Sequence, residues 1–466
     1  MIKLFDLKYC LVFSFLLFFA ALVAFSFWHV KKQWTQGDEP HYLIITQSLI
    51  SDYDLELKNN YQNLDYFQHH AYLIEDPHVT ITEHGDWYSV HNLLLPLMLV
   101  PGYLIGGRLG AVLIISLFSL GLLLEIFIIS RKLGASKKWS LILTATTLLS
   151  GTYLMWSTSI YPDIIFAYFY ALVFRLLFLE KISVLNYYLS GIIAGISVFL
   201  HVKSIILFIP LFFSYLLFLY FNKTKLKNII QNATALFLPW LIFLLFLIIF
   251  NKHYFNSWSL SAAYGSREGL FLFNPLINIM KALTDQEQGL LINFPIVTLA
   301  LICLPISIRL IRYQKLKLIL LIQILILIIY YLITMSYRDW YGGFAPAARY
   351  FCLLIPVFIP LLSLVMTKLR SILIQVLFIF TTLVQILLLF LLFYQQENPG
   401  FPDFSGKNKA INLLSEKTGW SLSSYLPHFF NNDAGNILAL VYIFIVVFLS
   451  TVLYFCFYHP AKHKAS

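Results

Sequence analysis

Long apolar runs separated by short polar stretches cover most of the chain. About 20 consecutive apolar residues are enough for a helix to cross the hydrocarbon core of a bilayer. The pattern therefore predicts an all-α polytopic membrane protein with about twelve transmembrane helices. The expected spans lie at about 9–30, 108–130, 139–159, 162–179, 187–202, 204–221, 229–250, 289–308, 318–336, 350–366, 371–393 and 437–457.

The lysines and arginines between these runs orient the bundle. They collect in alternate loops, as the positive-inside rule requires of the cytoplasmic side. The residues that follow this rule are Lys3, Lys8, Arg131–Lys138, Lys181, Lys223–Lys227, Arg309–Lys317, Lys368, Arg370, Lys462 and Lys464. Both termini are therefore predicted to be cytoplasmic. The orientation is better determined than the number of spans, because the run 187–202 is short for a crossing.

The external side receives two long polar loops, 31–91 and 394–436. Within the first loop, the run 40–50 has apolar positions at helical spacing and predicts a short helix along the membrane surface. The next run, 92–107, contains two prolines and several glycines, so we expect it to be interfacial or re-entrant. No repeat or soluble domain interrupts the pattern, and residues 1–466 are predicted to form one membrane domain.

The composition supports this fold class. Of the 466 residues, 60% are hydrophobic and 12% are charged, and the mean hydropathy is +0.79. A soluble domain carries about 25% charged residues. A net charge of +10 would suggest a nucleic-acid partner in a soluble protein, but here the cytoplasmic loops account for it, so no nucleic acid is expected. The four cysteines all lie in apolar runs and indicate neither a disulfide framework nor a metal–thiolate site.

Two adjacent carboxylates, Asp38 and Glu39, follow the first span closely. Either residue could simply cap a helix that begins near Pro40. However, ionisable groups at a membrane edge are candidates for function. Carboxylates in a low-dielectric environment can also act as a general base near neutral pH. The sequence therefore favours Asp38 and Glu39 as catalytic residues, with His41 and Tyr42 beside them.

Three further charged residues are predicted to face the same side. Asp163 follows Tyr161 and Pro162 at an external turn, where it is either a helix cap or a second acidic group of the same cavity. Lys203 lies between two apolar runs, where it either snorkels or meets an anion. Arg349 begins a span from outside, against the positive-inside statistics, so a specific anion such as a phosphate is favoured as its partner.

Aromatic residues close to Arg349 and histidines of the first external loop complete the candidate site. Trp340 and Tyr341 could stack on a sugar or lie in the interfacial aromatic belt. A divalent metal (Mg²⁺, Mn²⁺ or Zn²⁺) could be held together with phosphate oxygens. The candidate metal ligands are Asp38, Asp163, Glu83 and His84. No fixed ligand spacing is present, and an ordinary polar loop is the alternative for His84 and the neighbouring His91.

These motifs resemble those of GT-C glycosyltransferases that use polyprenyl-phosphate sugars, in the branch with protein O-mannosyltransferases and the bacterial lipid A aminoarabinose transferase. The resemblance covers the chain up to about residue 366. The motifs that carry it are G-D-E-P-H-Y at 37–42, Y-P-D at 161–163, D-Q-E-x-G-L-L at 285–291 and W-Y-G-G-x-x-x-x-x-R-Y at 340–350. Unlike the eukaryotic protein mannosyltransferases, the sequence has no large C-terminal soluble domain and no luminal module between spans.

The resemblance implies a GT-C-like bundle that transfers a hexose or pentose with inversion at the periplasmic face of a bacterial inner membrane. The implied donor is a polyprenyl-phosphate sugar, and the acceptor is an envelope glycan, lipid or protein. Asp38 would be the base or a metal-organising carboxylate, with Arg349 and Lys203 on the donor phosphate. The alternative is a transporter or flippase of lipid-linked sugars. It would need inverted repeats and charges at mid-span, for which only Glu125 and Arg175 are candidates.

Overall fold

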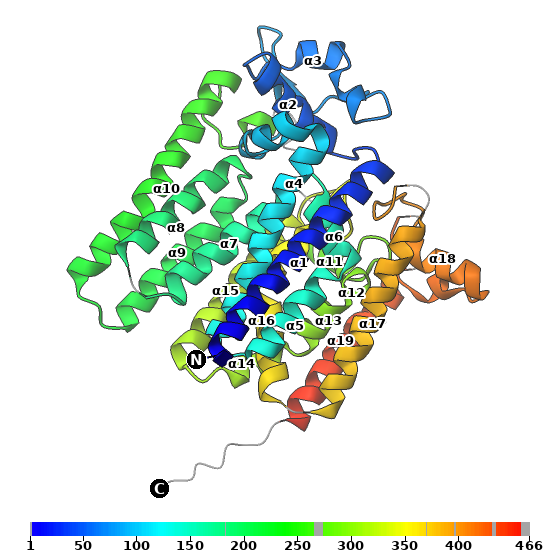
Figure 1. The fold of residues 1–466 in the computed structure, drawn as a ribbon. Helices are drawn as coiled ribbons and strands as arrows, with labels where there is room; N and C mark the ends of the chain where they lie inside the picture. The colour runs from blue at the N-terminus through cyan, green and yellow to red at the C-terminus, as the bar shows by residue number, and fades with distance from the viewer. Residues whose placement is uncertain are drawn as a thin grey trace.

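The computed structural model describes residues 2–181, 183–264, 274–369, 371–395, 398–430 and 435–457. Arg370, Lys462 and Lys464, which were predicted to be cytoplasmic, lie outside these residues. The described chain is mainly helical, and its long helices lie side by side in one bundle (Figure 1). The all-α class predicted from the sequence is therefore confirmed.

Eight helices of the described chain are long and apolar enough to cross a membrane. They are α1 (Ile2–Lys32), α4 (Leu94–Lys132), α9 (Ser204–Phe221), α10 (Leu226–Phe255), α15 (Gln314–Thr334), η4 (Arg349–Leu354) continued by α16 (Ile355–Lys368), α17 (Ile372–Tyr394) and α19 (Gly435–Cys456). A ninth candidate is the pair α6 (Gly151–Thr158) and α7 (Asp163–Phe178), which is bent by 99° at its break.

This number is lower than the twelve spans expected, because four expected spans are short or broken helices. The elements in these regions are α5 (Lys137–Leu148), α6, α7, α8 (Val184–Ile196), η2 (Ser197–Phe199), α12 (Leu290–Asn293), α13 (Pro295–Ile302) and α14 (Leu304–Leu310). The breaks have local causes. The Ser150 side chain caps α6, and Pro295 and Pro305 occupy the first turns of α13 and α14. Hydropathy averaged along the chain does not register such breaks.

The run 92–107 does not extend the second span as one straight helix. Within α4, Gly106 and Gly107 have non-helical backbone angles, and Gly107 has a φ of +54°. The two parts of α4 then approach each other backbone to backbone. A Cβ atom on Gly102 would lie 2.3 Å from the carbonyl oxygen of Gly110, so a glycine is needed for this contact. The predicted separation of this run from the second span is therefore confirmed.

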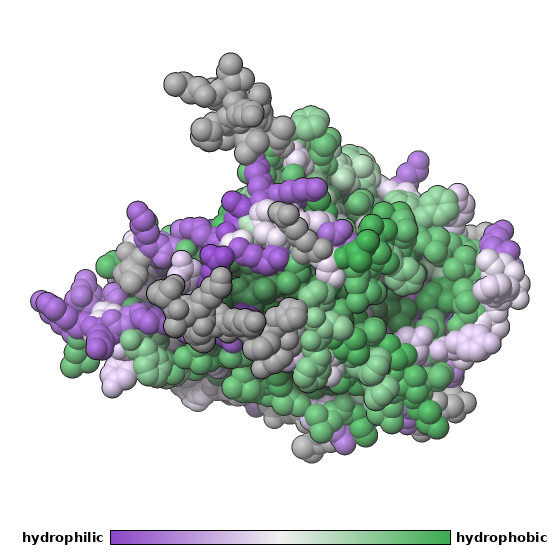
Figure 2. All heavy atoms as spheres, turned by 90° about the horizontal axis from the view of Figure 1, so that it is seen from below, coloured by the Kyte–Doolittle hydropathy of each residue, from purple (hydrophilic) through white to green (hydrophobic). Residues whose placement is uncertain are grey.

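The outward faces of the long helices are apolar. Phe246 of α10, Phe380 of α17 and Phe444 of α19 are all exposed, together with many aliphatic side chains. Seen from the end of the bundle near the termini, hydrophobic residues cover much of the molecule, and hydrophilic residues gather in patches (Figure 2). Soluble monomers rarely expose apolar surface of this extent. The protein is therefore a multi-pass membrane protein.

The first external loop forms a cap at the opposite end of the bundle (Figure 1). Its elements are α2 (Glu39–Ser51), α3 (Lys58–Gln62), η1 (Asp65–Gln68), β1 (Val79–Ile81) and β2 (Trp87–Ser89). The strands pair in antiparallel register with Thr80 opposite Tyr88. The helix α2 packs against α4, and Leu43 and Ile44 are fully buried. We expected α2 to lie open on the membrane surface, but the rest of the loop encloses it.

The last external loop carries α18 (Lys409–Thr418) and η5 (Leu422–Tyr425). The helix α11 (Pro275–Thr284) lies before the D-Q-E motif and packs against α15 and α19. Most of the hydrophobic core is one continuous cluster that links the long helices. A smaller cluster, with Ile45, Leu57 and Tyr66, supports the cap alone. The cap therefore has a small core of its own and also packs on the bundle through α2, and it lines one cavity with the first residues of α7 and η4 and with Lys203 just before α9.

Candidate active site

A cavity of about 880 Å³ lies between the cap and the bundle. It is lined by chain segments that are far apart in the sequence. Its polar lining residues are Gln36, Asp38, His41, Tyr42, His70, Glu75, Asp76, His78, His91, Asn92, Asp163, His201, Lys203, Tyr264, Tyr330, Tyr337, Asp339, Arg349 and Tyr350. The predicted site residues that the structure brings together here are Asp38, His41, Tyr42, Asp163, Lys203 and Arg349.

Asp38 occupies the N-cap position of α2, but its side chain makes no capping hydrogen bond. The carboxylate instead faces the cavity. Its Oδ2 atom lies 3.4 Å from Nη1 of Arg349, and its Oδ1 atom lies 3.6 Å from Nδ1 of His78. Burial raises the pKa of the Asp38 carboxyl, but the charges of His91, Arg349 and His78 together lower it below its ordinary value. Asp38 is therefore an ionised carboxylate at neutral pH, and the capping alternative does not describe its side chain.

Gly37 and Tyr161 hold the Asp38 segment against the loop that follows α15. The Tyr161 hydroxyl donates to the carbonyl oxygens of Gln36 (3.0 Å) and Phe344 (2.7 Å). Gly37 has a φ of +54°, and a Cβ atom there would lie 2.2 Å from the Phe344 carbonyl oxygen. Only glycine fits this contact. Two segments about 300 residues apart are thus joined directly beside Asp38.

Arg349 lies between two aromatic rings. The centre of its guanidinium lies 4.5 Å from the ring centroid of Tyr161 and 5.1 Å from that of Tyr350. Gly342 lies against its edge, because a Cβ atom there would be 2.9 Å from Nε of Arg349. On the other side, Nζ of Lys203 lies 5.0 Å from the Tyr350 ring. These cation–π contacts keep two positive charges close to each other without neutralising them.

Lys203 and Asp163 also line the cavity. Burial lowers the pKa of Lys203 to about 8, the charge of Asp163 acts against this shift, and Arg349 adds to it. Most Lys203 side chains therefore remain protonated at pH 7. Pro162 occupies the N-cap position of α7 and Asp163 is the first residue of the helix, so Asp163 is not its cap residue. The structure thus brings the predicted second carboxylate and both predicted cations into one cavity lining.

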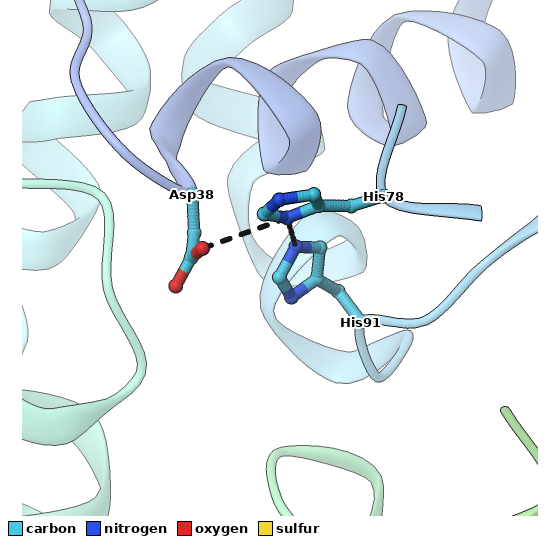
Figure 3. A group of neighbouring side chains, drawn as sticks. All are labelled: Asp38, His78 and His91. Carbon is cyan, nitrogen blue, oxygen red and sulfur yellow. Dashed lines mark hydrogen bonds and ion pairs between the residues drawn. The ribbon is translucent and has the colours of Figure 1, made fainter. Parts of the chain in front are cut away.

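Two histidines of the cap, His78 and His91, lie next to Asp38 (Figure 3). Nδ1 of His78 lies 3.0 Å from Nε2 of His91, and the ring of His41 stacks on that of His78 with centroids 3.8 Å apart. His78 precedes β1 and His91 follows β2, so the hairpin brings them together. Of these two histidines, only His91 was considered from the sequence, and no role was assigned to His78. The signal was available, because V-T-I and W-Y-S flank a turn with Gly85.

The candidate metal ligands change with this geometry. One ligand atom from each of Asp38, His78 and His91 lies within 4.8 Å of the others. Glu83 and His84, two of the predicted ligands, are exposed on the hairpin turn and do not line the cavity. Their side chains point away because the turn projects them beyond the paired strands. Asp163 lines the cavity but does not belong to this cluster.

Glu39 differs from its neighbour Asp38 in position. It is fully buried and does not line the cavity. Its two carboxylate oxygens accept hydrogen bonds from the backbone N–H groups of Ile160 (2.8 Å) and Gln36 (2.9 Å). Burial raises the pKa of Glu39, and the charge of Arg108 and these two bonds oppose the rise. The structure therefore places Glu39, predicted as catalytic, as a tie between the start of α2 and the turn before α7.

Trp340 and Tyr341 also lie outside the cavity lining. The Trp340 ring stacks on Phe430 with centroids 5.5 Å apart, and the Tyr341 ring lies 5.2 Å from that of Phe404. Both partners belong to the last external loop. The aromatic pair expected to stack on a sugar is thus packed within the protein, where it anchors this loop.

The D-Q-E motif also anchors the last external loop. Glu287 accepts backbone hydrogen bonds from Asp403 (2.7 Å), Phe404 (2.9 Å) and Gly406 (3.2 Å), and Asp285 accepts one from Phe429 (3.1 Å). Burial raises the pKa of Glu287 to about 7 and that of Asp285 to about 6. The motif holds the loop and contributes no group to the cavity.

Comparison with known proteins supports the fold. No protein-family model matches the chain, and no curated protein matches it. Among solved structures, ArnT from Cupriavidus metallidurans in the apo state aligns with a TM-score of 0.51 and 14% sequence identity, covering 97% of this chain and 77% of that one. The chain shares this fold. The helical membrane architecture expected from the sequence is therefore confirmed as the fold of ArnT.

A second structure of ArnT, bound to undecaprenyl phosphate, aligns with a TM-score of 0.47 and 14% identity over 94% of this chain and 71% of that one.

The charged residues Glu125 and Arg175 lie outside the cavity and pair with each other. Arg175 of α7 contacts Glu125 of α4 through two hydrogen bonds of 2.6 and 2.8 Å and also bonds Glu180. Glu125 and Arg175 were named above as candidates for the mid-span charges of a transporter, and in the structure they form an ion pair between α4 and α7.

Proposed function

We propose that the protein is a membrane glycosyltransferase that moves a sugar from a polyprenyl-phosphate donor to a cell-envelope acceptor. The observation that carries this proposal is the Asp38 carboxylate beside two closely spaced cations, Arg349 and Lys203, in one cavity at the bundle end. The distribution of cations along the sequence supports a periplasmic position of this cavity in a bacterial inner membrane. The shared fold with ArnT is consistent with this activity.

The proposed reaction uses the carboxylate and the two cations of this cavity. Asp38 accepts the proton of the acceptor hydroxyl as its oxygen attacks the anomeric carbon of the sugar. The bond between this carbon and the phosphate oxygen breaks, and polyprenyl phosphate leaves with the electron pair. Arg349 and Lys203 stabilise the negative charge that develops on the phosphate. Attack opposite the leaving group inverts the anomeric centre, for a hexose or a pentose alike.

A divalent cation fits the cluster of Asp38, His78 and His91. One carboxylate and two imidazoles with further positions open suit Zn²⁺ or Mn²⁺ better than Mg²⁺, which prefers oxygen ligands. Such an ion would supply positive charge next to the acceptor oxygen. The matching test measures the metal content of purified protein and of a His78→Ala, His91→Ala variant. Transfer that is unchanged after chelation, with no bound metal, would remove the cation from the proposal.

The acceptor is a hydroxyl-bearing envelope glycan, lipid or protein. We expect the acceptor hydroxyl to reach Asp38 at Oδ1, next to His78, because Oδ2 contacts Arg349. His41 is fixed on this side by the 2.6 Å hydrogen bond between its Nδ1 and the Tyr61 hydroxyl. Its stacking on His78 makes a rigid wall on which an acceptor can rest.

The decisive experiment measures sugar transfer from a labelled polyprenyl-phosphate sugar by purified protein in nanodiscs. Asp38→Asn should lower transfer by about 100-fold or more, because general-base catalysis contributes at least this factor. Glu83→Gln is the matched control, since it removes a carboxylate from the same external loop outside the cavity, and it should transfer at the normal rate. Full activity of Asp38→Asn would refute the role of the base. Movement of the intact donor between leaflets without transfer would support a flippase instead.

A further inference from the structure

The ion pair between Asp38 and Arg349 is unusually loose for its surroundings. Nη1 and Nη2 of Arg349 lie 3.4 and 3.5 Å from one oxygen, Oδ2 of Asp38. Charge-assisted hydrogen bonds between a guanidinium and a carboxylate are about 2.7–2.9 Å long and frequently use both oxygens. The other carboxylate oxygen faces His78. Asp38 therefore pairs with the Arg349 guanidinium without forming the short hydrogen bonds that such a pair can make.

Arg349 has contacts besides the one to Asp38. The centre of its guanidinium lies 4.5 Å from the ring centroid of Tyr161 and 5.1 Å from that of Tyr350, so Asp38 is not its only neighbour. Among the described residues, Nε of Arg349 has no hydrogen-bond partner. A buried donor without an acceptor is unfavourable. The guanidinium is therefore arranged to receive an anion that offers more oxygen atoms than Asp38 does.

A phosphate group is such an anion. It presents several oxygens to the planar fork of an arginine, and Lys203, 5.0 Å from the Tyr350 ring, adds a second positive charge to the same place. A phosphate that bonds to Nη1 and Nη2 would compete directly with Oδ2 of Asp38 for these atoms. A guanidinium can bind two anions through different donors, as Arg175 binds Glu125 and Glu180, so the competition concerns the two donors Nη1 and Nη2 that Asp38 uses.

We propose that the donor phosphate displaces Asp38 from Arg349, so that donor binding releases the carboxylate for the acceptor hydroxyl. This inference rests on the proposed function and adds an order of events to it. Without the donor, Arg349 retains Asp38. With the donor bound, Asp38 is free to accept a proton, and its negative charge faces the acceptor side. The acceptor hydroxyl is thereby activated only when a donor that carries the sugar is bound.

The test uses the reciprocity of competition. If Asp38 and the phosphate compete, removing the charge of Asp38 should tighten phosphate binding, by about tenfold as is typical of coupled sites. Binding of a short-chain polyprenyl phosphate to the full-length protein in detergent is measured for the natural sequence and for Asp38→Asn. The polyprenyl alcohol of the same length distinguishes binding of the phosphate from binding of the chain. A free-phosphate arm distinguishes a lipid phosphate site from a general anion site.

Two control variants sharpen the result. In an Arg349→Gln background, Asp38→Asn should no longer tighten binding, because the shared guanidinium is absent. Asp339→Asn removes a charge from the same cavity at a residue that accepts a hydrogen bond from Tyr341, and it should change affinity much less. Asp38→Ala, with the same expected direction, guards against a local effect of the asparagine. Thermal unfolding checks that each variant is folded.

The outcomes separate this inference from the function on which it rests. Weaker or unchanged phosphate binding by Asp38→Asn, with normal binding by the natural sequence, would overturn the displacement and leave the transferase proposal intact. Equal tightening by Asp38→Asn and Asp339→Asn would reduce the effect to general electrostatics and would also overturn it. Failure of the natural sequence to bind polyprenyl phosphate over the alcohol would overturn both proposals.

Discussion

Gly37→Ala should uncouple the catalytic loop from the bundle. The substitution adds one methyl group at a residue with a φ of +54°. The new Cβ atom would lie 2.2 Å from the carbonyl oxygen of Phe344 and 2.5 Å from the hydroxyl oxygen of Tyr161. Neither neighbour can move easily, because one is backbone and the other hydrogen-bonds two backbone carbonyls. The loop that carries Asp38 must therefore shift away from Arg349.

The magnitude follows from two contributions. A left-handed backbone angle disfavours a side chain by about 1–2 kcal/mol. Overpacking against backbone adds about 1–3 kcal/mol. The free energy of unfolding should therefore fall by about 2–5 kcal/mol, which is a large part of the stability of an ordinary domain. Transfer should fall by about 100-fold, because a displacement on the order of 1 Å at a reacting group has an effect of this size.

Gly85→Ala is the matched control. Gly85 also has a positive φ, of +86°, and lies in the same external loop, but a Cβ atom there would meet nothing within 4 Å. It should therefore show the backbone contribution alone, about 1–2 kcal/mol. Both variants are compared in detergent by unfolding temperature and by initial rate of transfer. Stability and activity equal to those of Gly85→Ala would show that Gly37 does not contact Phe344 as described.

Three further predictions concern other contacts. Burial raises the pKa of Glu287 from 4.5 to about 7, so between these pH values the folded state binds a proton that the unfolded state has lost. The free energy of unfolding should therefore fall as pH rises from about 4.5 to about 7. Glu287→Gln should flatten this dependence in melting curves measured against pH. Glu125→Gln should destabilise the protein by about 1–3 kcal/mol in unfolding experiments, since Arg175 loses its charged partner on α4 and keeps only Glu180, whereas an unchanged melting temperature would refute this role. Tyr161→Phe should lower stability by about 1–2 kcal/mol but keep the ring beside Arg349, so a loss of transfer as large as that of Asp38→Asn would contradict the structure.

Some parts of the site were accessible from the sequence because each depends on a local rule. Asp163, Lys203 and Arg349 stood out as charges at span ends, where the membrane penalises them. The positive-inside pattern placed them on one side of the bilayer. The structure brings all three to the same cavity as Asp38. Knowing on which face of the membrane these residues lie was thus sufficient to predict most of the charged residues that line the cavity.

Other parts could not be obtained in this way. Asp38 and Glu39 are adjacent and chemically alike, yet one faces the cavity and the other bonds to backbone groups of Ile160 and Gln36. Their separation depends on the direction in which α2 enters the protein. Similarly, Trp340 turned inward because the last external loop supplies Phe430, and this loop has no local signal for where it packs.

The amino-acid sequence by itself determined the class of protein, and it predicts the orientation in the bilayer and the side on which the cavity lies. These properties depend on the transfer of individual residues and short runs between water and lipid, which is a local quantity. Only the tertiary structure decided which polar groups meet. The approach of Asp38 to Arg349 depends on a glycine, Gly37, that fits against Phe344, and on a hairpin that brings His78 and His91 together. Distances between residues hundreds of positions apart are set by packing, which no local pattern encodes.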